Sequence, residues 1–387
     1  MLLRRLTCWR NGLTGFRLIP PPPTFSDATV QATPSLTPDS SDRPLVSIII
    51  PHYNGIEVLS ECLDSLKAST FERKEVIVVD NASEDGSADW IKEHHPEIRL
   101  IRNGTNEGYA GGCNRGAESA RGEFLLFLNN DTVHDSGWLE PLVEALTNSP
   151  EIAAVQPKIL NHFDRYLFDY AGACGGALDV LAFPFARGRL FLRQETDSGQ
   201  YDDEASIFWA SGTALMIRKS DFEAAGRFDE TFFAHQEEID LQWRLHLMGR
   251  DVKVIPSSLV YHKNAVTLQA QSVQKQYLNH RNSVLMLLSN YSFPLTIYLF
   301  PIRAALELVA SLYALVLLDF RHLLGIVKSM FWILVHPMVI LRRRRLVKSV
   351  RKVRDRTVIS RMYKGSIVLD YYLRGKRTYR DLSPSPS

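Results

Sequence analysis

Four short polar segments stand out in the first third of the chain, because each follows an apolar run. They are 51–55 (Pro-His-Tyr-Asn-Gly), 80–86 (Asp-Asn-Ala-Ser-Glu-Asp-Gly), 103–108 (Asn-Gly-Thr-Asn-Glu-Gly) and 129–131 (Asn-Asn-Asp). The ring of Tyr53 can stack on a nucleobase, and the carboxylate of Asp80 can accept a hydrogen bond from a ring N–H. At Gly108 a predicted helix begins, where backbone N–H groups can approach a phosphate. Each segment alone is also typical of a turn, but four in series favour a nucleotide site.

The residues around these segments alternate between strand and helix patterns. Apolar runs predict strands at 45–50, 75–80, 98–102 and 123–128, and helical spacing predicts helices at 58–66, 87–94 and 109–120. This alternation predicts a mostly parallel sheet, Rossmann-like and flanked by helices. In such sheets ligands bind at the carboxyl ends of the strands, where all four polar segments lie. The glycine fingerprints of dinucleotide-binding and P-loop proteins are absent, which disfavours both classes.

Composition narrows the class of protein further. The chain has 387 residues, of which 45% are hydrophobic and 23% charged, as in a globular protein. Its 45 Lys+Arg and 43 Asp+Glu nearly balance, which argues against nucleic acid as the main partner. The cysteines are far apart and form no Cys-x-x-Cys pair; they are Cys8, Cys62, Cys113 and Cys174. We therefore expect neither a zinc ribbon nor a redox dithiol, and we expect the protein to work in a reducing compartment.

The polar segments and their strands resemble the motifs of the family 2 glycosyltransferases, which have the GT-A fold. The matching runs are 46–55, 78–87, 106–116 and 125–131, and the similarity is greatest to the rhamnosyltransferase-like branch. The resemblance covers about residues 45 to 290. It implies a glycosyltransferase domain over 45–284, with a nucleotide-sugar-binding half at 45–131 and an acceptor-binding half at 132–284.

The resemblance also implies roles on the donor side. Tyr53 and Asp80 would hold the base, and the other residues expected at the nucleotide are Pro51, Asn81, Gly108, Asn114 and Asn130. The metal-binding DxD motif of the family reads Asn129-Asn130-Asp131, so Asp131 would bind Mn²⁺ or Mg²⁺ and stabilise the leaving diphosphate. A cap for the helix predicted at 138–146 is the alternative for Asp131. His262 lies where several family members supply a metal-binding histidine; otherwise it would contact phosphate or lie in a loop.

On the acceptor side, the run from Glu237 to Arg244 resembles the Glu-Asp-x-Asp-Leu-x-x-Arg signature of the family. The general base of the family falls on Glu238, which would deprotonate the acceptor hydroxyl, with Asp240 as the fallback. Acidic residues also favour a helix start for electrostatic reasons alone, which can explain one or two of the three carboxylates. The residues expected to shape the acceptor site are Trp209, His235 and Glu237. For Trp209, burial in the core is an equal alternative.

The two ends of the chain differ from its middle. Residues 1–44 are rich in Pro, Ser and Thr and predict a disordered extension. Residues 285–345 are strongly apolar, but charged residues interrupt them, so they predict either a spanning hairpin or helices that lie on a membrane. Residues 346–387 form a basic tail. The arginines at 342–345 would attract anionic headgroups and mark the cytoplasmic side.

These features predict an inverting, metal-dependent glycosyltransferase at the cytoplasmic face of a membrane. The resemblance favours transfer of rhamnose from dTDP-rhamnose to a saccharide or lipid-linked acceptor in cell-surface polysaccharide synthesis. Two alternatives remain, namely the same fold with a UDP-hexose donor, and a membrane scaffold without activity. Departures from the family pattern at Asn129 and Glu238 support the scaffold.

Overall fold

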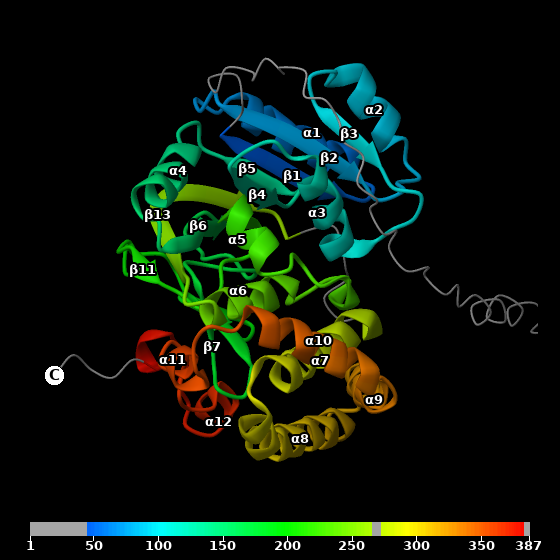
Figure 1. Cartoon of the computed structure of the whole chain (residues 1–387), viewed down its shortest axis with the longest axis vertical. Coiled ribbons are helices and arrows are strands. Elements are labelled where there is room, and N and C mark those ends of the chain that lie inside the picture. Colours follow the sequence, from blue (N-terminus) through cyan, green and yellow to red (C-terminus); the bar gives the residue numbers. More distant parts are fainter. Residues whose placement is uncertain (1–44, 265–271, 383–387) are drawn as a thin grey trace, which may run out of the picture. The chain divides into compact units, whose positions relative to one another are not determined.

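The apolar runs form the centre of a nine-stranded sheet in the computed structural model, which describes residues 45–264 and 272–382. Strands β1 (Val46–His52), β2 (Lys74–Asp80), β3 (Arg99–Arg102) and β4 (Phe124–Leu128) are parallel to one another, in the order β4-β1-β2-β3. Their carboxyl ends therefore lie at one edge of the sheet, and the predicted α/β architecture is confirmed (Figure 1).

Helices cover both faces of this sheet, because β1 is buried on both sides. Ile49 packs with residues of α3 (Gly108–Ser119), whereas Ile48 and Ile50 pack with α1 (Ile56–Lys67) and α4 (Leu139–Asn148). Helix α2 (Ser87–His94) precedes β3. The small residues of α3 allow close packing on the sheet, since a Cβ at Gly116 would lie 2.3 Å from the Ile49 side chain.

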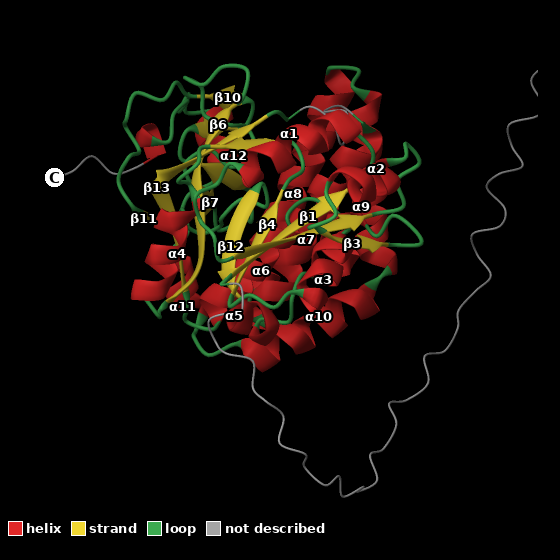
Figure 2. Cartoon of the chain, turned by 90° about the horizontal axis from the view of Figure 1, so that it is seen from above, coloured by secondary structure: helices red, strands yellow, loops and turns green. Residues whose placement is uncertain are grey.

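The second half of the chain extends the same sheet. The added strands are β5 (Thr132–His134), β6 (Ile152–Asn161), β11 (Ala205–Ser206), β12 (Ala214–Arg218) and β13 (Asp251–His262). Strand β12 runs antiparallel between β4 and β6, so its first residue, Ala214, pairs with Leu128 at the end of β4. The start of β12 thus joins the edge where the polar segments lie (Figure 2).

Further elements surround this extension. The helices are α5 (Lys219–Ala224), the short 3-10 helix η2 (Glu230–Phe232) and α6 (Glu237–Leu247). A small antiparallel sheet contains β7 (Gly176–Leu178), β8 (Pro184–Ala186), β9 (Arg189–Leu190) and β10 (Arg193–Gln194).

The C-terminal helices share a core with the acceptor half. They are α7 (Val273–Asn290), α8 (Phe293–Val316), α9 (Phe320–Val335), α10 (Pro337–Val350), α11 (Asp355–Ile359), α12 (Ile367–Tyr372) and the 3-10 helix η3 (Arg380–Leu382). Trp243 of α6 and Leu285, Ile333 and Val347 of these helices belong to one cluster. All described residues lie in one unit, 43–387. The apolar helices therefore extend the acceptor half and do not form a separate body.

The two ends of the chain differ in how much of them the structure describes. Residues 1–44 lie outside the described residues, as does Cys8. Residues 346–387 were predicted as a basic tail, and most of them are ordered. The backbone N–H of Tyr363 donates to the Leu178 carbonyl over 2.9 Å. The N–H of Ile367 donates to the Asp179 carboxylate over 3.0 Å, which fastens the tail to the small sheet.

Candidate active site

The turns after β1 and β2 are hydrogen-bonded to each other. Asn54 adopts a left-handed conformation, with φ of 56°, and its backbone N–H donates to the Ser83 hydroxyl over 2.9 Å. The carboxylate of Asp80 accepts the backbone N–H of Ser83 over 3.3 Å and is buried. Tyr53 projects beside it with 37% of its surface exposed. The two residues predicted to hold the base therefore follow neighbouring strands at one edge.

The floor of this edge is built by Asn81 and Pro51. The Asn81 side chain donates to the Gly108 carbonyl over 3.1 Å and accepts from Asn103 over 2.9 Å. A Cβ at Gly112 would lie 2.9 Å from the Asn81 amide nitrogen and 3.2 Å from Pro51, so only glycine fits without displacement. Asn81 and Pro51 thus fix where α3 begins, and their contact with a nucleotide stays a prediction.

Asp131 and His262 meet at the ends of β4 and β13. The His262 Nε2 lies 3.0 Å from an Asp131 carboxylate oxygen, and its Nδ1 lies 3.2 Å from the Asp169 carboxylate. Burial lowers the pKa of His262, but the carboxylates of Asp169 and Asp131 outweigh burial and raise it to about 10. The adjacent Asn130 amide contacts His52 Nδ1 at 2.8 Å. Asp131 and His262, expected as metal ligands from sequences far apart, are direct neighbours.

These residues fit a divalent cation in part. A carboxylate oxygen and an imidazole nitrogen suit Mn²⁺ better than Ca²⁺. Asp169 is placed to accept a hydrogen bond from His262 Nδ1 and orient the ring, as the outer partners of metal-bound histidines do. Within residues 45–264 and 272–382, no three His, Cys, Asp or Glu side chains are arranged to hold a metal together. Diphosphate oxygens and water would supply the remaining ligands. Nothing local in the sequence indicates Asp169.

The N-terminus of α6 carries the second group of carboxylates. Glu237 and Glu238 each have a buried carboxyl oxygen, Oε2, without a hydrogen-bond partner in the described structure. Burial raises the pKa of Glu238 to about 7. Burial, and then the charge of Glu238, raises the pKa of Glu237 well above its ordinary value. A carboxyl group with a pKa near neutrality and a free oxygen has the properties of a general base.

Tyr109 links the carboxylates of α6 to the carboxyl ends of the parallel strands. Its hydroxyl donates to the Gly212 carbonyl over 2.6 Å, and the neighbouring Thr213 carbonyl accepts the backbone N–H of Asn129 over 3.0 Å. Glu237 and Glu238 are close enough to Tyr109 to help burial raise its pKa. The metal-side residues after β4 and the carboxylates of α6 therefore lie at the same edge of the sheet. Tyr109 stands in the third polar motif, but its spacing gave no sign of this contact.

Asp240 is structural. It is fully buried and its carboxylate accepts from Arg244 Nε over 3.0 Å, from Arg343 over 2.5 Å and from Asn290 over 2.9 Å. Arg343 also contacts the Asp229 carboxylate at 2.5 Å, so one guanidinium from α10 joins the start of the loop that precedes Glu238 to the first turn of α6. An acceptor has no access to Asp240, which excludes it as a substitute base.

Two further expected site residues point elsewhere. Trp209 is only 3% exposed, and its indole N–H donates to the Ala177 carbonyl over 2.9 Å, so it is a core residue and no platform for a sugar. The Asn114 amide donates to the Phe228 carbonyl over 2.9 Å and so anchors the loop before α6. His235 lies in the same loop with a left-handed φ of 69°. Unlike the paired side chains of Trp209 and Asn114, its buried Nε2 has no described hydrogen-bond partner.

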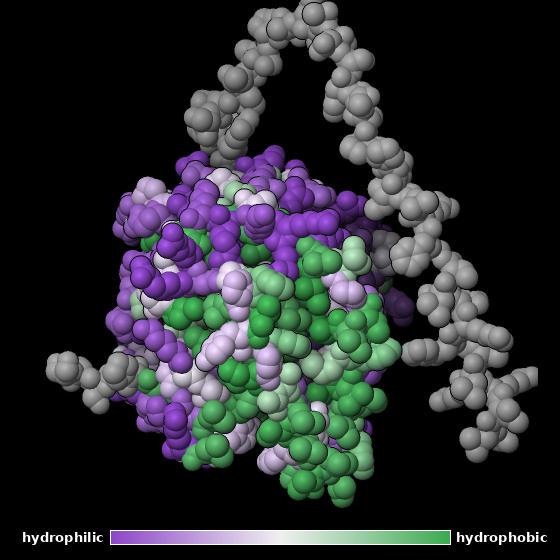
Figure 3. Space-filling model, turned by 60° about the horizontal axis from the view of Figure 1, so that its bottom comes forward, coloured by the Kyte–Doolittle hydropathy of each residue, from purple (hydrophilic) through white to green (hydrophobic). Residues whose placement is uncertain are grey.

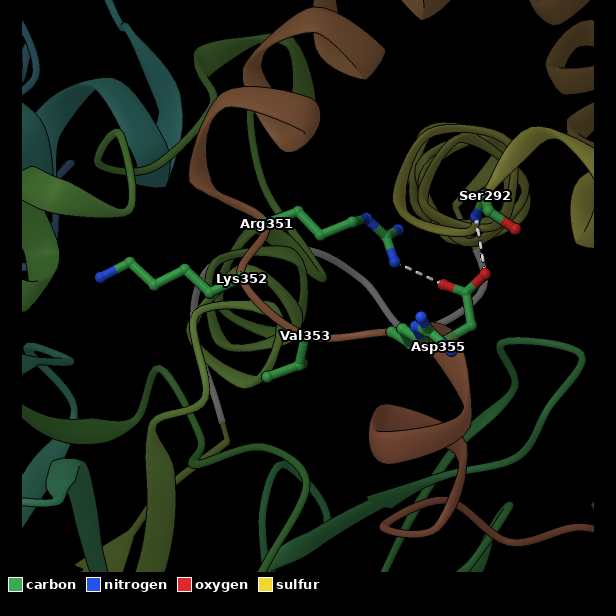
Figure 4. Close-up of a pocket in the computed structure, with 6 residues that line it drawn as sticks. Ser292, Arg351, Lys352, Val353 and Asp355 are labelled. Carbon is green, nitrogen blue, oxygen red and sulfur yellow. Dashed lines mark hydrogen bonds and ion pairs between the residues drawn. The ribbon is translucent and has the colours of Figure 1, made fainter.

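A surface hollow between the start of α8 and the segment that joins α10 to α11 is distinct from this site. It is lined by Ser292, Arg351, Lys352, Val353, Arg354 and Asp355 (Figure 4). The Asp355 carboxylate already accepts from Arg351 over 2.6 Å and from the Ser292 backbone over 3.1 Å. With its one carboxylate paired, the hollow offers no catalytic group.

Comparison with known proteins agrees with this geometry. Residues 47–224 match the model of Glycosyl transferase family 2. The chain is 25% identical over 263 residues to the N-acetylglucosaminyl-diphospho-decaprenol L-rhamnosyltransferase of Mycobacterium tuberculosis, covering 64% of this chain and 85% of that protein. It is 33% identical over 230 residues to the O-antigen biosynthesis protein RfbC of Myxococcus xanthus, covering 57% of this chain but only 18% of that protein.

A solved structure shares the fold. The crystal structure of GalNAc-T7 with UDP, GalNAc and Mn²⁺ superposes on this chain with a TM-score of 0.54 at 17% sequence identity. The match covers 68% of this chain and 50% of the GalNAc-T7 chain. The sheet with its flanking helices is therefore a GT-A glycosyltransferase fold. Residues 47–224 therefore form a family 2 glycosyltransferase domain, and the chain is similar to a rhamnosyltransferase. The enzyme class that the motifs predict, transferase, is confirmed.

Proposed function

We propose that this glycosyltransferase inverts the anomeric centre of its donor sugar by a single displacement that depends on a divalent cation. The observation that carries the proposal is the buried carboxyl group of Glu238, with a free oxygen and a pKa of about 7, at the same sheet edge as Asp131 and His262. One base and one site for the leaving group suffice for direct displacement, which inverts configuration.

In the proposed reaction, the oxygen of the acceptor hydroxyl attacks the anomeric carbon of the donor sugar, and Glu238 takes the proton from that hydroxyl. The bond from that carbon to the diphosphate breaks, and the nucleoside diphosphate leaves. Asp131 and His262 would hold the cation, which supplies positive charge to the departing diphosphate. Tyr53 and Asp80 would hold the base, and His235 and Glu237 would border the acceptor.

The proposed donor is dTDP-rhamnose, supported by the similarity to the mycobacterial rhamnosyltransferase. The proposed acceptor is a saccharide carried on a lipid diphosphate, because the name of the same relative contains such a lipid, and the product would serve cell-surface polysaccharide synthesis. A panel of dTDP-, UDP- and GDP-sugars with purified protein and Mn²⁺ tests the donor. Turnover with a UDP-hexose alone would refute rhamnose.

Binding of dTDP and UDP, measured by calorimetry with and without Mn²⁺, separates an enzyme from an inactive scaffold. We expect Mn²⁺ to strengthen binding of one of the two, and binding of neither would favour the scaffold. Glu238→Gln should retain nucleotide binding and lose transfer. The exposed Glu93→Gln in α2 is the matched control, expected to transfer at the wild-type rate.

We also propose that the C-terminal helices lie on the cytoplasmic face of the plasma membrane. By length and composition α8 could span a membrane, and α9 with α10 could form a second span bent by 74°. The outward faces of α8 and α9 expose large apolar residues, visible as the green area of Figure 3, among them Tyr298, Leu308, Leu312, Val316, Phe331 and Leu334. Such a surface fits the apolar boundary of a bilayer.

Contacts on the inner face of α8 favour a position in the membrane plane over a span. Arg303 is buried and pairs with Glu307 over 2.7 Å, and Glu307 also contacts His280 of α7 at 2.6 Å. A span would carry this polar contact into hydrocarbon, where charged groups are costly. Exposed Arg342 and Arg345 on α10 can meet anionic headgroups.

Vesicle flotation tests this position. The protein should float with phosphatidylglycerol vesicles, less with phosphatidylcholine, and alkaline carbonate should release it. Leu312→Glu with Leu334→Glu should abolish flotation, whereas Glu93→Gln should not. Resistance to carbonate would instead demonstrate a spanning helix.

A further inference from the structure

Buried cations in the described part of the chain are generally paired with carboxylates. Arg187 contacts Asp203 at 2.8 Å, and Arg244 and Arg303 have the partners given above. Arg189 of β9 differs from these three: it is 8% exposed and has no described carboxylate within the 4.0 Å of an ion pair, although the more distant charge of Asp169 acts on it. One nitrogen, Nη1, donates to the Phe191 carbonyl over 2.9 Å, but the buried Nε has no partner.

Lys275 is a second cation without a partner. It lies in the first turn of α7 and is partly buried, and its ammonium group makes no hydrogen bond or ion pair with the described residues. Both cations approach the ring of Tyr170, which is 36% exposed. The Arg189 guanidinium carbon lies 4.7 Å from the ring centre, and the Lys275 nitrogen lies 6.0 Å from it.

This cluster lies between the candidate metal ligands and the candidate base. Tyr170 directly follows Asp169, whose carboxylate contacts His262. On the other side, burial and then the charge of Lys275 lower the pKa of His235 to about 4, so Lys275 is close to the loop that leads to Glu238. A ligand that contacts both cations would therefore lie beside the loop that precedes Glu238, the candidate base.

A buried charge is unfavourable unless an opposite charge neutralises it, and the Asp169 carboxylate that acts on Arg189 lies beyond ion-pair distance. Two cations beside one aromatic ring can balance the negative charge of a diphosphate, and their N–H groups can donate to its oxygens. Helix α9 packs against α7 next to Lys275, since a Cβ at Gly325 would lie 2.6 Å from Gln276. The outer face of α9 is the apolar surface with Phe331 and Leu334. A lipid chain lying along α9 could thus present its diphosphate to Lys275.

We propose that Arg189 and Lys275 bind the diphosphate of a lipid-linked acceptor on either side of Tyr170. This assignment rests on the proposed function, because it takes the acceptor to be lipid-linked. It names the chemistry that would select such an acceptor over a free saccharide. The diphosphate of the nucleotide donor is the other source of the same anion, and the experiment separates the two.

Calorimetry with geranyl diphosphate as the probe tests the site in the full-length protein. Wild-type protein should bind geranyl diphosphate and not geraniol. The double substitution Arg189→Gln with Lys275→Gln should weaken that binding by about tenfold or more. Arg193→Gln, an exposed cation in the same small sheet, is the matched control and should leave binding unchanged. Binding of dTDP with Mn²⁺ should be unaffected in every variant.

Other results would overturn the proposal. Loss of dTDP binding, with geranyl diphosphate retained, would assign the cations to the donor. Equal binding of geranyl diphosphate in all variants would show that no such site exists. The binding assay needs no turnover, so failure of every donor in the transfer assay would refute the proposed function while leaving this site intact.

A thermal unfolding series excludes a purely structural role. Removing a buried charge that forms no ion pair should not destabilise the fold, so Arg189→Gln should unfold at or above the wild-type temperature. Arg187→Gln removes a paired cation and should unfold at a lower temperature. If Arg189→Gln lowers the midpoint as much as Arg187→Gln does, Arg189 is a structural residue and the proposal fails.

Discussion

The pH dependence of transfer gives the sharpest test of Glu238. A general base works in its deprotonated form, and burial raises the pKa of this carboxyl group to about 7 from 4.5. Because the folded-state pKa is raised, kcat/KM should rise about tenfold per pH unit below pH 7 and level off above it. At pH 5 the rate should be about one hundredth of the plateau, whereas an unperturbed carboxylate would still give most of it.

The neighbouring Glu237 offers an internal control. Burial, and then the charge of Glu238, raises its pKa well above the ordinary value. Glu237→Gln leaves the Glu238 carboxyl group in place and should leave the midpoint of the profile near pH 7. Glu238→Gln should remove both the activity and the acidic limb.

Steady-state rates should be measured from pH 5 to 9 with saturating donor and Mn²⁺, at constant ionic strength. Metal saturation must be verified at each pH, because the Asp131–His262 pair also binds protons. A midpoint near pH 4.5, or a limb that persists in Glu238→Gln, would refute the assignment of Glu238 as the base.

Three further predictions follow from contacts that the structure shows. Arg343→Met leaves the buried Asp229 carboxylate without its ion pair and removes one of the two arginine partners of Asp240, so it should lower the free energy of unfolding by about 3–5 kcal/mol, against less than about 0.5 kcal/mol for exposed Arg345→Met, as measured by urea denaturation. Asp169→Asn should weaken Mn²⁺ binding about 10- to 100-fold in a calorimetric titration with nucleotide present, and unchanged affinity would contradict its orienting role. Gly108→Ala, at φ of +72° and with its Cβ 2.3 Å from the Phe233 carbonyl oxygen, should destabilise the fold by about 1–3 kcal/mol, whereas Gly104→Ala has open space and should not.

The sequence predicted the elements that local patterns encode. The apolar run before Pro51 had to be a strand buried on both faces, and β1 is buried in that way, between two layers of helices. Helix α2 begins and ends at the residues expected, and the other predicted elements differ by a few residues at their ends. The family and the fold were predicted correctly, because four motifs in order constrain both.

Local patterns could not decide which side chains face one another across the fold. Trp209 and Asn114 stand in motifs, yet one packs in the core and the other holds a loop more than a hundred residues away. Arg343 belongs to a run of four arginines that suggests a membrane tail, but it is buried between Asp229 and Asp240.

The sequence by itself therefore determined the sheet, its polar edge and the identity of the base and metal-side carboxylates as candidates, since these depend on periodicity and on short motifs. Only the tertiary structure decided that Asp169 stands behind His262, that Asp240 is occupied by arginines, and that Arg189 and Lys275 share Tyr170. The physical reason is that burial and charge pairing depend on distance in space, whereas His262 and Asp169 are 93 residues apart along the chain and Arg343 and Asp240 are 103 apart.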